Sequence, residues 1–124
     1  MTERVSKLQI AERQDGEVTI LVLSGEITAG AGDIVFGRHV DDLIKKGQVR
    51  IVVNLSDVTY IDSAGVGMMV AEMKMVRQNS GAMKLANLTA RSHHLLAMMK
   101  LKLVFDIFPD EEAAVRSFAW GLRL

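Results

Sequence analysis

Two runs of apolar residues near the start of the chain have the short periodicity of β-strands. Residues 8–13 alternate apolar and polar side chains, and residues 18–23 are more continuously apolar. Between them stand Gln14, Asp15 and Gly16, which are typical of a hairpin turn. The pattern predicts an antiparallel hairpin whose first strand forms an edge of a sheet and whose second strand lies further inside.

The first helical pattern begins at Asp33 and ends at Gly47. Its apolar positions recur every three or four residues and make one stripe, formed by Phe36, Val40, Leu43 and Ile44. Two lysines in the last turn favour a helix because cations complement the negative end of its dipole. We therefore predict an amphipathic helix after the second strand.

The central segment, residues 49–70, combines the two periodicities. Residues 51–53 are β-branched and are followed by the polar Asn54, which predicts a short strand that is buried on both faces and stops there. Further on, the helical stripe returns at Val66, Met69, Val70, Met73 and Val76. The segment therefore predicts a strand, a turn and a helix that begins at Asp62 and Ser63.

The last third of the chain continues the alternation of strands and helices. Residues 83–88 predict a strand, residues 95–99 a helix, and residues 105–108 a short last strand. Pro109 and the acidic residues after it open a final helix, since both favour a helix N-terminus. We expect this helix to be docked by Phe118, Trp120 and Leu122.

Strands that alternate with helices indicate an α/β fold. We expect one domain over residues 1–124, with a four- to five-stranded, mostly parallel sheet, an antiparallel edge strand and about four helices. Parallel strands bring their carboxyl ends to one edge of the sheet, where ligands and partners of such folds bind. The segment from Gly25 to Asp33 should therefore lie beside Ser63.

Composition narrows the classes of function. The 124 residues carry no formal net charge and no basic tract, so we expect neither direct nucleic-acid binding nor attraction to a membrane. The absence of cysteine excludes disulfides and thiolate chemistry. Without a signal-peptide pattern or a long apolar run, the expected location is the cytoplasm.

The candidate chemistry lies at the start of the central helix. Asp62 and Ser63 are both residue types that cap helices, so either one could serve only that purpose. Gly65 and Gly67 follow in the first turn, where each costs up to about 1 kcal/mol of helix propensity. We expect that these glycines let another molecule approach the backbone around Ser63.

The opposite side of the same helix carries Met68, Glu72 and Met75. Exposed methionines suit an adaptable binding surface, so Met68 and Met75 could form the rim of a partner surface. Alternatively, a neighbouring helix covers this side. The adjacent His93 and His94 diverge on a helix and do not predict a metal site.

Residues 54–67 carry a resemblance to a known family. The sequence from Asn54 to Gly67, with its Asp-Ser-x-Gly-x-Gly element after an apolar strand, resembles the signature of the STAS domain, found in bacterial anti-sigma factor antagonists and in sulphate transporters. Residues 23–27, 83–88 and 103–113 resemble the family's other strands and its last helix. The resemblance covers nearly the whole chain.

The resemblance implies a protein-binding module switched by phosphorylation, with no cofactor and no enzymatic activity. The serine directly after the aspartate would carry the phosphate, which is Ser63 here, and Asp62 would either cap the helix or help a kinase accept the serine. The implied partners are an anti-sigma factor with serine kinase activity and a serine phosphatase, and the protein would be a monomer or weak homodimer. We expect the partner surface to contain Glu26, Thr28, Asp62, Ser63, Gly65, Gly67 and Met68.

Two alternatives remain open from the sequence. Within the family, the chain could instead be a scaffold subunit of a large stress-sensing complex in which the serine gates the release of a kinase. An enzyme is disfavoured, because Ser63 lies outside a Gly-x-Ser-x-Gly elbow and no phosphate-binding loop with Gly-Lys-Ser is present.

Overall fold

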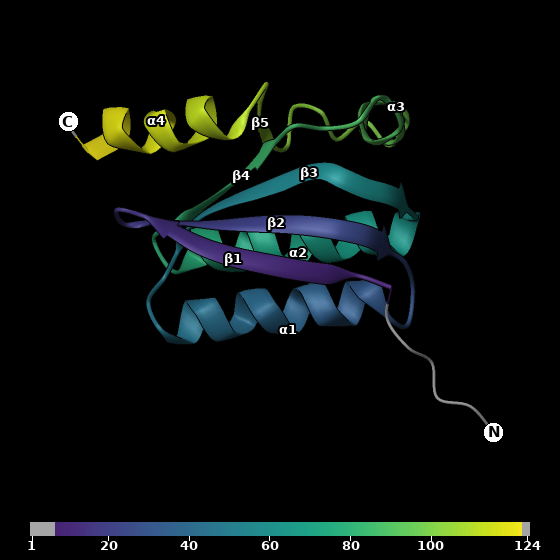
Figure 1. Cartoon of the computed structure of the whole chain (residues 1–124), viewed down its shortest axis with the longest axis horizontal. Helices are drawn as coiled ribbons and strands as arrows, with labels where there is room; N and C mark the ends of the chain where they lie inside the picture. Colours follow the sequence, from purple (N-terminus) through teal and green to yellow (C-terminus); the bar gives the residue numbers. More distant parts are fainter. Residues whose placement is uncertain (1–6, 123–124) are drawn as a thin grey trace.

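The computed structural model describes residues 7–122, with side chains as far as residue 118, and these residues form one five-stranded sheet. The strands lie in the order β1 (Gln9–Asp15), β2 (Val18–Ile27), β3 (Arg50–Ile61), β4 (Ala82–Ala86) and β5 (Asp106–Phe108). The β1–β2 pair is antiparallel and the other neighbouring pairs are parallel. The predicted α/β sheet with an antiparallel edge strand is confirmed (Figure 1).

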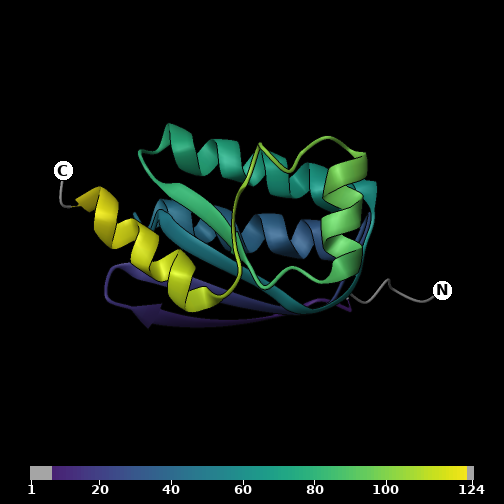
Figure 2. The same ribbon diagram turned by 90° about the horizontal axis from the view of Figure 1, so that it is seen from above.

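Four helices are formed by the described residues: α1 (Gly32–Lys45), α2 (Ser63–Gln78), α3 (Ala90–Met98) and α4 (Glu111–Leu122). Figure 2 shows α1 and α2 side by side, and α3 and α4 at opposite ends of the sheet. The sequence predicted each of these helices in the right place along the chain. The proposed docking residues Trp120 and Leu122 have side chains outside the described part, whereas Phe118 is buried in the core under α4.

The sheet separates two cores because alternate residues of its strands face opposite sides. The larger core lies under α1, α2 and α3 and takes its sheet residues from Leu21, Leu23, Ile51, Val53, Met83 and Leu85. The smaller core lies under α4, where Ile20, Val52 and Ala86 pack against Ala114 and Phe118. The central strands are therefore covered on both faces, as their continuous apolar runs predicted.

Strand β3 is much longer than the sequence analysis predicted. It does not stop at Asn54 but continues to Ile61, with Leu55, Val58 and Ile61 buried. Asn54 is tolerated inside the strand because its amide nitrogen donates to Glu111 Oε2 at 2.6 Å and its oxygen accepts from the Ser56 N–H at 2.9 Å. The polar stop was therefore a wrong prediction.

The extension of β3 determines where the site lies. Its last residues pair with the end of β2, so that Glu26 lies opposite Tyr60 and Ile27 opposite Ile61. Irregularities after Val22 and after Gly25 adjust the register between the two strands. Strands β2 and β3 therefore end at the same edge of the sheet. Both α1, which follows β2, and α2, which follows β3, begin there.

Candidate functional site

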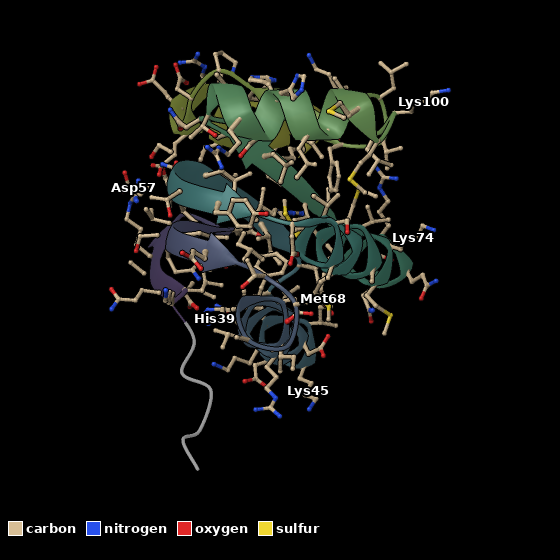
Figure 3. All side chains as sticks on the ribbon, turned by 90° about the vertical axis from the view of Figure 1, so that its right-hand side faces the viewer. His39, Lys45, Asp57, Met68, Lys74 and Lys100 are labelled. Atoms are coloured by element: carbon tan, nitrogen blue, oxygen red, sulfur yellow. The ribbon has the colours of Figure 1, made fainter. Side chains whose placement is uncertain are left out.

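The predicted meeting of Ser63 with the segment after β2 is seen at the carboxyl edge of the sheet. The backbone N–H of Asp62 donates to the Ile27 carbonyl at 3.3 Å, which joins the ends of β3 and β2. On the same edge, the Thr59 hydroxyl donates to the Gly25 carbonyl at 3.2 Å. Figure 3 looks onto this edge, with the helices α1 and α2 seen end-on.

Asp62 is the N-cap of α2. Its Oδ1 accepts from the Gly65 N–H at 2.8 Å, and its Oδ2 accepts from the Ala29 N–H at 3.0 Å. Partial burial alone would raise the pKa of this carboxyl, but hydrogen bonds from Ala29, Gly65 and Ala64 outweigh it and lower the pKa below its usual value. The carboxylate is therefore ionised and clamps the loop after β2 to the start of α2.

Ser63 is the first residue of α2 and is exposed. Since Asp62 supplies the cap, the helix does not need the Ser63 hydroxyl for that purpose. The described contacts give this hydroxyl no hydrogen-bond partner within the chain. Of the two capping candidates in the sequence, the structure assigns the cap to Asp62 and leaves Ser63 open to solvent.

The two glycines after Ser63 have different surroundings. A Cβ at Gly65 would lie 2.2 Å from the Ile27 carbonyl oxygen, so this buried glycine lets α2 pack against the end of β2. A Cβ at Gly67 would meet nothing within 4 Å, and Gly67 is exposed. The prediction that Gly65 opens the backbone to a partner is therefore wrong, whereas Gly67 does leave a bare surface one turn from the N-terminus of α2.

The methionine side of α2 is only partly exposed. Met68 is half-buried where α2 meets α1 (Figure 3). Its Sδ atom lies so close to Gly37 of α1 that a Cβ added to this glycine would be only 2.9 Å away. Glu72 is buried, with 6% of its surface exposed, whereas Met75 is 46% exposed. A neighbouring helix therefore covers Met68 and Glu72, and of the two methionines proposed for a partner surface only Met75 has a largely free side chain.

The burial of Glu72 agrees with the alternative that a neighbouring helix covers this side of α2. The Oε1 atom of Glu72 is buried without a hydrogen-bond partner in the described structure. Burial raises the pKa of Glu72 to about 7, and a hydrogen bond and charge repulsion from Asp41 on α1 act in the same direction. The α1–α2 contact thus contains a carboxyl pair that holds a proton near neutral pH.

The loop residues expected to touch a partner lie at the same edge. Glu26 is half-buried and still belongs to β2, and Thr28 is half-buried in the turn that follows. The Thr28 carbonyl accepts from the N–H groups of Ala31 and Asp33, which shapes the short turn into α1. Both residues are within the surroundings of Asp62, although neither has a fully exposed side chain.

Three exposed residues at or near this edge were missed by the sequence analysis. Tyr60, 45% exposed, precedes Asp62 by two residues, and the Arg91 guanidinium lies 5.7 Å from the centre of its ring. Ile34, 40% exposed, lies in the first turn of α1. The alternation of β3 could have placed Tyr60 on an exposed position, but only with its true length known.

The histidine pair occupies α3. His94 is exposed, and His93 is half-buried with a buried Nδ1 atom that lacks a hydrogen-bond partner. Within the described residues, no three histidine, aspartate or glutamate side chains are grouped as metal ligands.

Comparison with known proteins gives the chain's family. The model of the STAS domain matches residues 9–114. An anti-sigma F factor antagonist from Paenibacillus polymyxa is 30% identical over 109 residues, which cover 87% of this chain and 92% of the relative. An anti-sigma-B factor antagonist from Bacillus subtilis is 33% identical over 94 residues, covering 76% and 84%. The chain belongs to the STAS domain family.

The STAS fold is also found by structural similarity. The Bacillus cell fate determinant SpoIIAA in its phosphorylated form superimposes with a TM-score of 0.67 and 21% identity, covering 88% of this chain and 99% of that chain. Among the described helices of this STAS domain, none has the length and apolar character needed to cross a bilayer. The resemblance seen at residues 54–67 is thereby confirmed at the level of family and fold.

Proposed function

We propose that this STAS domain is an anti-sigma factor antagonist whose binding is switched by phosphorylation of Ser63. Without phosphate, the carboxyl edge around Ser63 binds an anti-sigma factor that is also a serine kinase, and the sigma factor is released. With phosphate, the partner is excluded, and a serine phosphatase restores the binding form. The observation that carries the proposal is the exposed Ser63 hydroxyl beside a helix cap made entirely by Asp62.

The position of Ser63 makes phosphorylation compatible with the fold. A phosphoserine carries about two negative charges near neutral pH. The free N–H groups and dipole at a helix N-terminus favour such a charge by about 0.3–1 kcal/mol. Because Asp62 holds the cap on its own, the modified serine need not replace any hydrogen bond of the folded chain.

The same charge opposes a bound partner. A partner packed against Ser63 would have to bury the phosphate next to the ionised Asp62. A loss of about 4 kcal/mol of binding free energy weakens affinity roughly a thousandfold. The switch therefore acts by excluding the partner and requires no large conformational change.

The relatives support the partner class. The two curated relatives are named as antagonists of anti-sigma F and anti-sigma-B factors, and the structural relative SpoIIAA was solved with phosphate attached. We assign Glu26, Thr28, Gly67 and the half-buried Met68 to the proposed surface with Asp62 and Ser63, and we add the exposed side chains of Ile34 and Tyr60. Gly65 contributes by allowing the helix to approach β2, not by touching the partner.

The test is a capture experiment followed by a kinase assay. Wild-type chain and the Ser63→Asp variant are used to capture proteins from the source cell, and a protein held only by the wild type is identified by mass spectrometry. We expect an anti-sigma factor with a kinase domain, which in purified form should transfer one phosphate from ATP to the wild type and none to Ser63→Ala. Ser56→Ala is the matched control, because Ser56 is also exposed and should not matter.

Two results would contradict the proposal. Phosphate found on Ser56 or Thr59 would move the switch away from Ser63, and equal capture by wild type and Ser63→Asp would exclude switching by charge. Size-exclusion chromatography separates the remaining alternative, since a free antagonist elutes as a monomer or dimer and a scaffold subunit elutes in a particle of roughly megadalton size.

A further inference from the structure

A pocket of about 290 Å³ lies at the end of the sheet away from Ser63. It opens where β3 and β4 begin and where α4 crosses the face opposite α1 and α2; Figures 1 and 2 show α4 at the end of the sheet away from α3. Within the described part of the chain it is lined by Arg50, Ser80, Gly81, Ala82, Lys84, Ser117 and Phe118. The pocket shares no residue with the proposed switch site.

Lys84 is the central charged group of this pocket. It lies on β4, and its Nζ atom is 4.1 Å from the centre of the Phe118 ring and 5.7 Å from that of Phe108. Burial lowers the pKa of Lys84, and the charge of Asp106 only partly offsets this effect. The half-buried ammonium is therefore stabilised only in part, by the faces of the two aromatic rings and by the charge of Asp106.

The hydrogen bonds of Lys84 are incomplete. Its ammonium donates to the Ser117 Oγ at 2.6 Å, and the Ser117 hydroxyl in turn donates to the Ala114 carbonyl at 2.6 Å. No carboxylate lies within ion-pair distance of Lys84 among the described residues. An ammonium has three N–H donors, so two of them are left for an acceptor from outside the chain.

Arg50 adds a second cation to the wall of the pocket. It is the first residue of β3, opposite Ala82 of β4. Its Nη1 donates to Glu17 Oε1 at 2.8 Å, but Glu17 is 80% exposed, and the guanidinium has further donors. None of the lining residues that the structure describes is acidic. The described lining thus contains two cations, Lys84 and Arg50, whose acidic neighbours Asp106 and Glu17 lie outside the lining.

We propose that this pocket binds a small organic oxyanion, with a phosphate or carboxylate group held between Lys84 and Arg50. Lys84 supplies its two remaining N–H donors, Arg50 supplies charge and a guanidinium fork, and Ser80 lines the same space. Ala82 and Phe118 provide an apolar wall for the body of the ligand. The volume is near the lower end for small-molecule sites, which favours a compound of about one ring.

A purely structural role for Lys84 makes a different prediction. If the lysine only packs its stem on Phe118 and exposes its head to water, anions should interact with it no more strongly than with any surface lysine. Specific, saturable binding that depends on Lys84 distinguishes the two interpretations.

The experiment is a titration of the ¹⁵N-labelled full chain followed by NMR. The probes are inorganic phosphate, phenyl phosphate and benzoate, each compared with sodium chloride at the same ionic strength. We expect saturable shifts of the amides in residues 80–84 and 117–118, with phenyl phosphate binding more tightly than inorganic phosphate because its ring reaches Phe118. The tighter of phenyl phosphate and benzoate identifies the preferred oxyanion.

Variants make the result decisive. Lys84→Met keeps an apolar stem over Phe118 and should weaken binding by about tenfold or more. Lys74→Met, on the exposed side of α2, is the matched control and should bind like the wild type. Ser63→Asp should also bind normally, since its site lies at the other end of the sheet. If Lys84→Met fails to fold, Arg50→Met serves as the second test, with a similar loss expected.

The proposal is overturned by any of three outcomes. Sodium chloride could produce the same shifts as the organic anions, the shifts could rise without saturating, or Lys84→Met and Arg50→Met could bind the probes as well as the wild type. None of these results would affect the phosphorylation switch at Ser63, because the two sites share no residue.

Discussion

Replacing Glu72 by glutamine should stabilise the chain at neutral and alkaline pH. Glu72 is 6% exposed, faces α1 and lies beside Asp41, so its ionised form has neither solvent nor a cation to stabilise it. Glutamine has nearly the same shape, stays neutral, and can donate a hydrogen bond to the Asp41 carboxylate. The substitution therefore removes a buried charge while it keeps the packing of α1 against α2.

The magnitude follows from the raised pKa. The pKa of Glu72 rises from 4.5 to about 7 in the folded chain, so the folded state holds a proton that the unfolded state has lost between these values. Stability from this group is therefore fully present below pH 4.5 and is lost as the pH rises to about 7. At about 1.4 kcal/mol per pKa unit, a rise of about 2.5 units corresponds to a loss of at most about 3–4 kcal/mol.

Urea denaturation of wild type and Glu72→Gln at about pH 5 and about pH 8 measures this effect. We expect the variant to gain up to about 3–4 kcal/mol at the higher pH and much less at the lower pH. Asp41→Asn is the matched control and should retain part of the pH dependence, because burial contributes more than the Asp41 charge. A gain that is equal at both pH values, or a loss at pH 8, would refute the reasoning.

Three further predictions concern the N-terminus and the exposed side of α2. Asp62→Ala should lower the free energy of unfolding, measured by urea denaturation, by about 0.5–2 kcal/mol. Because the pKa of Asp62 is lowered in the folded chain, this stabilisation is present above pH 3.8, the ordinary pKa of the group, and is lost as the pH falls below that value. Gly65→Ala should lower the thermal midpoint, because the new Cβ would meet the Ile27 carbonyl. Gly67→Ala should raise the midpoint slightly, because alanine has the higher helix propensity. A shift of the midpoint in the same direction for both variants would contradict the packing argument. Met75→Lys should leave the thermal midpoint nearly unchanged, because the side chain is largely exposed, but should lower the affinity for the captured partner in a titration. A lower thermal midpoint would show that Met75 is packed.

The order of the elements could be predicted because each depends on local periodicity. The alternation in residues 8–13 and the stripe from Phe36 to Ile44 each report how one segment meets the core. The length of β3 could not be predicted, because Asn54 looks like an end of a strand until its contact with Glu111 is known. That contact joins residues separated by 57 positions, so no local pattern contains it.

The candidate site likewise has features that the sequence could predict and features that it could not. The sequence predicted that Ser63 and the segment after β2 lie together, since the topology of a parallel sheet requires it. It could not distinguish Gly65 from Gly67, which look alike along the chain but differ in what lies above them. Nor could it reveal that Glu72 is buried, because this depends on how closely α1 approaches α2 at Gly37.

In the proposed switch, Asp62 caps the helix and the adjacent Ser63 carries the regulatory phosphate. If Ser63 were the N-cap, a phosphate there would replace the hydroxyl that holds the first turn, and modification would change helix stability as well as partner binding. Asp62 instead uses one carboxylate oxygen for the Gly65 N–H and the other for the Ala29 N–H, which fixes both α2 and the neighbouring loop. Under this proposal the cap does not depend on the Ser63 hydroxyl, so we expect a phosphate there to act on partner binding and to leave the stability of α2 nearly unchanged.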